Sequence, residues 1–145
     1  MDPMIKLSTN DLSLAKSFIG SDIQREINLA HNGKGAGNFL CALGLLCYTE
    51  FAGNITGDTS QSKIKRFNDF FRTLGAEYND LIENSVDVYG KLRSDLVHCY
   101  STSGCVIYML ATGKDTKGVW TDEHGIFHMC IEKYFKDFMA AFEKL

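Results

Sequence analysis

The sequence predicts a mainly α-helical domain: a bundle of four to five helices with a small β-hairpin inserted before the C-terminal helix. Through most of the chain, apolar residues recur at steps of three and four, which is the spacing of one helix face. Between residues 105 and 130 the pattern changes to short apolar runs separated by glycine-containing turns, which is typical of short strands. The 145 residues, 45% of them hydrophobic, fit one compact domain spanning 1–145.

Four helices are predicted before residue 101. The first covers 12–30 and follows a capping cluster at 8–11. The glycine-rich stretch 33–37 ends it, and Asn38 caps a second helix to Phe51 that is apolar on nearly every face, which indicates a buried, central position. The third carries Ile64 and Phe67 and ends at Gly75. The fourth keeps the same period from Tyr78 to Leu96, so we expect one long helix that stops before 101–104.

Short strands are expected at 106–111, 119–120 and 126–130, joined by hairpin turns at 113–118 and 122–125. A closing helix should run over 131–145, because Ile131, Tyr134, Phe135, Phe138 and Phe142 repeat at helical spacing.

Composition excludes several classes of protein. With 15 Lys and Arg against 18 Asp and Glu, the net charge of -3 argues against a generic nucleic-acid coat, although local basic patches remain open. The longest apolar run, 39–48, is shorter than the roughly 18 residues of a membrane-spanning helix. The N-terminus does not have the pattern of a signal peptide. Five cysteines without a CxxC pair suit reduced thiols, so we expect a cytoplasmic protein with no membrane partner.

Two motifs offer a ligand site and are set aside. The loop 33–37 has neither the P-loop nor the dinucleotide-binding spacing, and it follows a helix instead of a strand, so its glycines are interpreted as helix-stop residues. Cys99, Cys105, His124 and His128 could in principle bind zinc, but the first spacer is too long for the usual pattern. We therefore expect no metal and no cofactor.

The main candidate site is the segment from Arg93 to His98. An imidazole can move protons at neutral pH, and a guanidinium can clamp phosphate oxygens through two N–H groups. Ser94 and Asp95 lie four and three residues before His98, so either could orient its ring. Five residues at about 100° each leave Arg93 and His98 roughly 140° apart on an ideal helix, so convergence requires a long Arg rotamer or a loosened helix end. The alternative is a surface Arg and a His stabilised by the helix dipole.

A second Arg-to-His spacing, Arg25 to His31, lies in the first helix. At most one of the two pairs is expected to form a site, and the sequence does not establish whether Arg25 and His31 contribute.

The segment from Tyr89 to Tyr100 resembles the HEPN domain family. In similar domains a late helix carries Leu, Arg, a polar residue, three to five further residues and His, as Leu92, Arg93, Ser94 and His98 do here. Ser94 stands where Asn, Asp or His is commoner. The resemblance extends loosely from residue 37 to the last helix. It implies a metal-independent ribonuclease, a hydrolase with Arg93 and His98 as the catalytic pair.

Other members of the family are inactive binding or scaffold modules, some paired as antitoxin with a minimal nucleotidyltransferase. Two hypotheses therefore stay open: RNA cleavage, and binding of a partner protein or nucleotide without chemistry. In the first, a homodimer would duplicate the single motif across a two-fold axis. A local basic track of Lys63, Lys65 and Arg66, or Lys91 beside the motif, would hold the RNA substrate.

Overall fold

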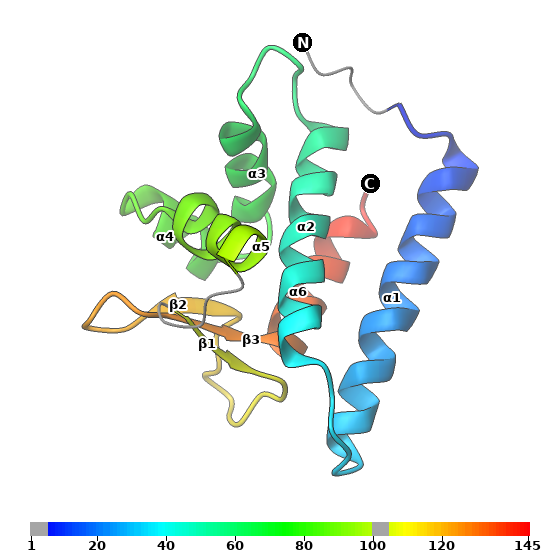
Figure 1. The fold of residues 1–145 in the computed structure, drawn as a ribbon. Coiled ribbons are helices and arrows are strands. Elements are labelled where there is room, and N and C mark those ends of the chain that lie inside the picture. Colours follow the sequence, from blue (N-terminus) through cyan, green and yellow to red (C-terminus); the bar gives the residue numbers. More distant parts are fainter. Residues whose placement is uncertain (1–5, 100–104) are drawn as a thin grey trace.

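A computed structural model of the chain describes residues 6–99 and 105–145, with the backbone alone at 98 and 99. The molecule is mainly helical, with a small three-stranded sheet before the last helix, so the predicted fold class is confirmed (Figure 1). The helices are α1 (Thr9–His31), α2 (Asn38–Thr56), α3 (Lys63–Arg72), α4 (Ala76–Glu83), the π-helical segment η1 (Tyr89–Ser94), α5 (Asp95–Cys99) and α6 (Ile131–Phe142). The strands are β1 (Cys105–Tyr108), β2 (Val119–Thr121) and β3 (Phe127–Cys130).

Helix α1 begins three residues before the predicted start because Ser8 caps it. The Ser8 hydroxyl oxygen accepts a hydrogen bond from the Asp11 backbone N–H, which satisfies one of the free donors of the first turn. The residues that α1 buries are Ile19, Ile23 and Ile27, spaced by four and therefore on one face.

Helix α2 is the central helix, as its apolar composition predicts. It lies between α1 and α3, with α6 packed behind it (Figure 1). By length and composition alone its 19 residues would suffice to cross a membrane. Here they pack as a core helix: Leu45 and Leu46 are fully buried, and the hydroxyl groups of Thr49 and Tyr134 lie 2.6 Å apart inside the core.

Helices α2 and α3 cross closely because Gly53 has no side chain. A Cβ atom at Gly53 would lie 2.5 Å from the backbone oxygen of Arg66. The crossing brings Phe67 and Phe71 of α3 into the core, where both are fully buried. The glycine is therefore a requirement of helix packing.

The prediction of one long fourth helix is wrong, because the helix is interrupted between Glu83 and Tyr89. Asn84 ends α4, and Ser85 takes a left-handed backbone conformation with φ of 59°. A new helical segment then begins after Asp87, whose carboxylate accepts a hydrogen bond from the Gly90 backbone N–H at 2.8 Å. The apolar period survives the break because both pieces bury residues in the same core, as Tyr78 and Leu92 do.

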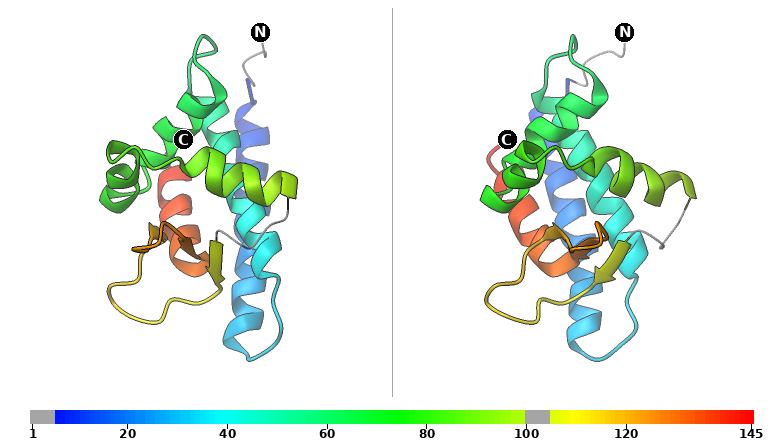
Figure 2. Two further views of the ribbon diagram at one scale, coloured as in Figure 1. Left: turned by 60° about the vertical axis from the view of Figure 1, so that its left-hand side comes forward. Right: turned by 90° about the vertical axis from the view of Figure 1, so that its left-hand side faces the viewer.

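Segments η1 and α5 then run across α2, above the sheet, as both views in Figure 2 show. Helix α5 is described as far as Cys99, and the predicted stop at 101–104 lies outside the described residues.

The sheet has the order β1-β3-β2. Strands β2 and β3 form the expected antiparallel hairpin around residues 122–126. Strands β1 and β2, which were expected to be joined by a hairpin, are not neighbours; β1 instead pairs in parallel with β3, with Val106 opposite His128. The connection 109–118 crosses to the far side of β3. It packs tightly at Gly118, where a Cβ atom would overlap the Tyr78 hydroxyl group.

Candidate functional site

Arg93 lies in the π-helical segment η1, largely buried between η1 and α2. Its Nη2 atom is 2.5 Å from Oε2 of Glu50, and the two side chains are 16% and 14% exposed. Its guanidinium carbon also lies 5.2 Å from the centre of the Tyr89 ring, within cation–π range. The guanidinium is therefore held in place by a carboxylate and an aromatic face.

Tyr89 is the third member of a group that we call the Arg93 cluster, which consists of Glu50, Tyr89 and Arg93. The Tyr89 ring packs edge-to-face on Phe67, with ring centres 5.3 Å apart. Burial raises the pKa of Tyr89, the Glu50 charge adds to this, and the charges of Arg93 and Lys63 oppose it. The cluster is thus a partly desolvated charge network.

Sequence reasoning missed Glu50 and Tyr89 as members of this site. A signal for Glu50 was present: it is the single charged residue in α2, an otherwise apolar helix. Charged side chains are rarely buried without a partner, so a lone Glu in a central helix indicates a nearby cation.

His98 lies in α5, the helix that follows η1 directly. Its side chain is outside the described residues, so the structure gives no Arg93–His98 distance. Arg93 belongs to a π-helical segment, a rare wide-turn geometry that is frequent at functional sites, whereas the backbone from Asp95 to Cys99 is regular α-helix. Ser94 closes this segment, and Asp95 begins α5 and is exposed.

Three of the four expected substrate-binding cations are exposed. Lys91 is exposed on η1. Lys63 and Lys65 are exposed on α3, where Lys65 pairs with Asp69 at 2.8 Å. Arg66 departs from the expectation.

Arg66 is buried, with 8% of its surface exposed, and its role is structural. Its Nε atom donates to Oδ1 of Asn54 at 3.0 Å, and Nη1 donates to the backbone oxygen of Gln61 at 2.7 Å. Its side chain passes directly over Gly57. Arg66 therefore fastens the α2–α3 connection and does not extend a surface track.

In the other Arg-to-His pair, Arg25 and His31 each contact a different carboxylate. Arg25 is exposed and pairs with Asp22, whereas the His31 ring contacts Oε2 of Glu132 on α6 at 2.5 Å. The His31–Glu132 contact ties the end of α1 to the start of α6.

One backbone N–H group of the glycine-rich loop 33–37 is already bonded to a side chain of the protein. The Gly37 backbone N–H, at the start of α2, donates to Oε2 of Glu26 at 2.9 Å, so a carboxylate of α1 stands where an anion would bind.

Two of the four zinc candidates, His124 and His128, have other contacts, and the side chain of Cys99 lies outside the described residues. Both ring nitrogens of His128 have partners, Oδ2 of Asp122 at 2.9 Å and the Tyr108 hydroxyl group at 3.1 Å. His124 is exposed and pairs with Glu123, and Cys105 is buried. Across 6–97 and 105–145, no three His, Cys, Asp or Glu side chains are grouped so that they could hold a metal.

Comparison of the chain with protein-family models, curated proteins and solved structures finds no match. The resemblance to HEPN domains therefore depends on the Arg93-to-His98 pattern alone. The structure adds the surroundings of Arg93 to that pattern.

Proposed function

We propose that the protein is a metal-independent endoribonuclease of HEPN type, with Arg93 and His98 in the active site at a homodimer interface. The observation that carries the proposal is the fixed guanidinium of Arg93, held by Glu50 and Tyr89 two residues before the start of α5, the helix that bears His98. A positively charged group positioned in advance is what stabilises a phosphoryl transition state.

The reaction is attack of a ribose 2'-hydroxyl on the adjacent phosphate. The 2'-oxygen forms a bond to phosphorus as its proton passes to a general base, and the bond from phosphorus to the 5'-oxygen breaks as that oxygen takes a proton from a general acid. The products are a cyclic phosphate and a 5'-hydroxyl end. His98 moves protons, and Arg93 stabilises the charge that develops on the phosphoryl oxygens.

A two-fold axis supplies the second proton-transfer group. Each chain has one Arg93–His98 motif, and the reaction needs an acid and a base. A C2 dimer with the motif near its interface brings two copies of His98 together.

Glu50 is a positioning residue in this proposal. It contacts Nη2, one of the three guanidinium nitrogens of Arg93, and so sets the direction of the planar group.

The same ion pair favours a second candidate function, a catalytically inactive binding module. Glu50 already neutralises Arg93 in a largely buried position, so a phosphate would compete with a carboxylate for the guanidinium. In that case the surface binds a partner protein, such as a nucleotidyltransferase-type antitoxin, or a nucleotide, without chemistry.

Incubation of purified protein with labelled single-stranded RNA in EDTA separates the two functions. We expect wild type to cleave RNA, to leave DNA of the same sequence intact, and to produce cyclic phosphate ends. His98→Ala should lower the rate about a hundredfold or more, and Arg93→Lys should also be costly because an ammonium cannot replace a two-pronged clamp.

His124→Ala is the matched control, because His124 is exposed and distant in sequence from the motif; it should keep full activity. Full activity in His98→Ala would assign the cleavage to a contaminant or to another site. Absence of cleavage by wild type on several RNAs would favour the binding module.

A further inference from the structure

Three aromatic rings lie together on one face of the sheet, one from each strand. Trp120 of β2 is directly opposite His128 of β3, and Tyr108 of β1 is two residues beyond Val106, the parallel partner of His128. Side chains two residues apart in a strand share a face. The three rings are nearly parallel, with interplanar angles of 8° to 12° and ring centres 5.0 to 5.9 Å apart.

A chain of hydrogen bonds fixes two of these rings, His128 and Tyr108. Oδ1 of Asp122 accepts the backbone N–H groups of His124 and Ile126, and Oδ2 lies 2.9 Å from Nε2 of His128. These bonds, led by the one from His128, lower the pKa of Asp122. An ionised Asp122 only accepts, so Nε2 of His128 donates to it, and Nδ1 of His128 lies 3.1 Å from the Tyr108 hydroxyl, from which a neutral imidazole accepts. Tyr108 and His128 are thus held in one arrangement, and the Trp120 ring stacks against both to complete a platform of three rings.

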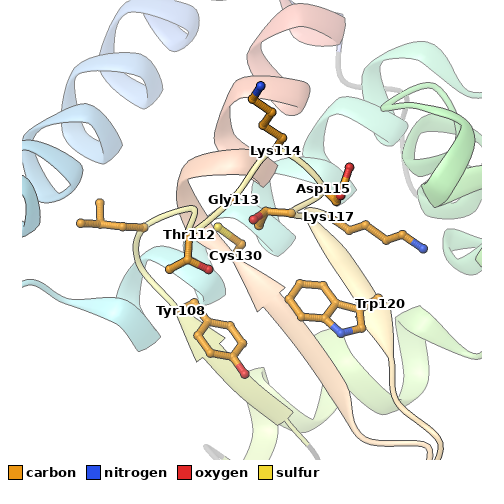
Figure 3. Close-up of a pocket in the computed structure, with 10 residues that line it drawn as sticks. Tyr108, Thr112, Gly113, Lys114, Asp115, Lys117, Trp120 and Cys130 are labelled. Atoms are coloured by element: carbon orange, nitrogen blue, oxygen red, sulfur yellow. The ribbon is translucent and has the colours of Figure 1, made fainter.

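A cavity of about 510 Å³ opens beside this platform, within the range of small-molecule sites. Tyr108 and Trp120 flank one end of it, and Cys130 lies between them, as Figure 3 shows. The connection 109–118 forms the opposite rim. The rim residues that can bind an anion are Thr112, Lys114, Thr116 and Lys117, with Asp115 as the acid among them.

The two lysines are exposed, and Figure 3 shows their side chains pointing outward from the rim. Such ammonium groups are flexible point charges that can turn toward a phosphate. The Tyr108 and Trp120 rings contact each other, so a ligand ring would stack on their cavity side and not between them.

We propose that this cavity binds a nucleoside monophosphate, with the base stacked on the Trp120–Tyr108 platform and the phosphate held by Lys114 and Lys117. Every base has a π-face that stacks on aromatic side chains, and lysine is a general phosphate binder. The platform matches the base of such a ligand, the hydroxyl groups of the rim match its ribose, and the two cations match its phosphate. The site is separate from the Arg93 cluster and does not depend on the proposed ribonuclease activity.

Trp120 is the single tryptophan of the chain, so its fluorescence reports on this cavity alone. Titration of the wild-type protein with UMP and AMP should give saturable quenching, and calorimetry should give the same affinity. By calorimetry, Trp120→Leu should weaken binding about tenfold, within the range found for loss of one stacked base. The double variant Lys114→Gln, Lys117→Gln should weaken UMP binding severalfold and leave the binding of uridine unchanged, because uridine has no phosphate.

The matched controls are Phe18→Leu, an exposed aromatic residue on α1, and Lys34→Gln, an exposed lysine in the α1–α2 loop; both should bind like wild type. His98→Ala should also bind like wild type, which keeps this test apart from the ribonuclease test. Circular dichroism checks the fold of Trp120→Leu, and the lysine variants alter only the exposed rim.

Three results would overturn the proposal. The first is no saturable binding of UMP or AMP up to about 10 mM, a concentration at which even a millimolar complex would be nearly saturated. The second is unchanged binding in both Trp120→Leu and the double lysine variant, with loss in Arg93→Lys, which would place the nucleotide at the Arg93 cluster. The third is tighter binding of indole-3-acetate than of either monophosphate, which would make the ligand an aromatic carboxylate.

Discussion

The Glu50–Arg93 ion pair is the residue-scale feature with the largest consequences. Both side chains are mostly buried, and removal of one member leaves the other charge in a partly desolvated place. The energetic cost of such a loss far exceeds that of an exposed pair. The same contact therefore supports the fold and sets the orientation of the guanidinium that the proposed chemistry uses.

We expect Glu50→Ala to lower the free energy of unfolding by about 2 kcal/mol or more, somewhat less than for a fully buried pair. Urea denaturation measures this. The control is Asp69→Ala, which breaks the exposed Lys65–Asp69 pair of α3 and should cost about 0.5 kcal/mol. Equal costs for the two variants would show that the Glu50 contact contributes no more than a surface ion pair.

The buried thiols make a second residue-scale prediction. Burial raises the pKa of Cys41 and of Cys105 from 9.0 to about 11. The thiolate is the reactive form, so in the folded protein both should react slowly with iodoacetamide at pH 8, and their rates should keep rising up to about pH 11. Peptide mass spectrometry of timed samples measures each thiol separately, and a urea-unfolded sample is the control.

The raised pKa values of Cys41 and Cys105 also determine how the free energy of unfolding changes with pH. A folded-state pKa above the unfolded value means that the unfolded chain loses its protons first as pH rises. The stabilisation is therefore complete below pH 9 and is lost as pH rises toward 11. Native rates for Cys41 and Cys105 that level off near pH 9 would contradict the prediction.

At the scale of elements, the α2–α3 crossing depends on a single glycine. Gly53 and Gly44 are both in α2, but only Gly53 faces a neighbouring backbone at a distance too short for a side chain. A Cβ atom at Gly44 would meet the Tyr48 ring at 3.5 Å, an ordinary contact. The two positions therefore separate helix propensity from helix packing.

We expect Gly53→Ala to destabilise the protein by about 1–3 kcal/mol, because α3 must move away from α2. Gly44→Ala should be neutral or stabilising by up to about 1 kcal/mol, since alanine favours a helix over glycine. Thermal and urea unfolding of both variants measure the difference. A stabilising Gly53→Ala would mean that α2 and α3 have room to adjust.

The broken fourth helix shows where periodicity misleads. The apolar spacing from Tyr78 to Leu96 is real, and the structure buries both residues. Periodicity reports which residues face the core and does not report whether the backbone between them is continuous. Asn84 and Ser85 carried the local signal for a break, since Asn and Ser compete with the helix for backbone hydrogen bonds.

At the scale of the whole molecule, the proposed chemistry requires a second copy of the chain. We expect a homodimer with Arg93 and His98 near the two-fold axis, because one chain offers one motif and the reaction needs two proton-transfer groups. Multi-angle light scattering at micromolar concentration and physiological salt measures the mass. A clean 16.2 kDa monomer would contradict the dimer and weaken the ribonuclease proposal with it.

The sequence by itself determined the fold class, the central place of the helix that begins at Asn38, and the position of the small sheet before the last helix. These follow from local composition and periodicity, which act along the chain. Tertiary structure decided the parallel pairing of β1 with β3, the burial of Arg66, the Glu50–Arg93 contact and the alignment of Tyr108, Trp120 and His128. Each of these joins residues that are distant in sequence or depends on the space left by another element, and spacing along one segment carries no information about either.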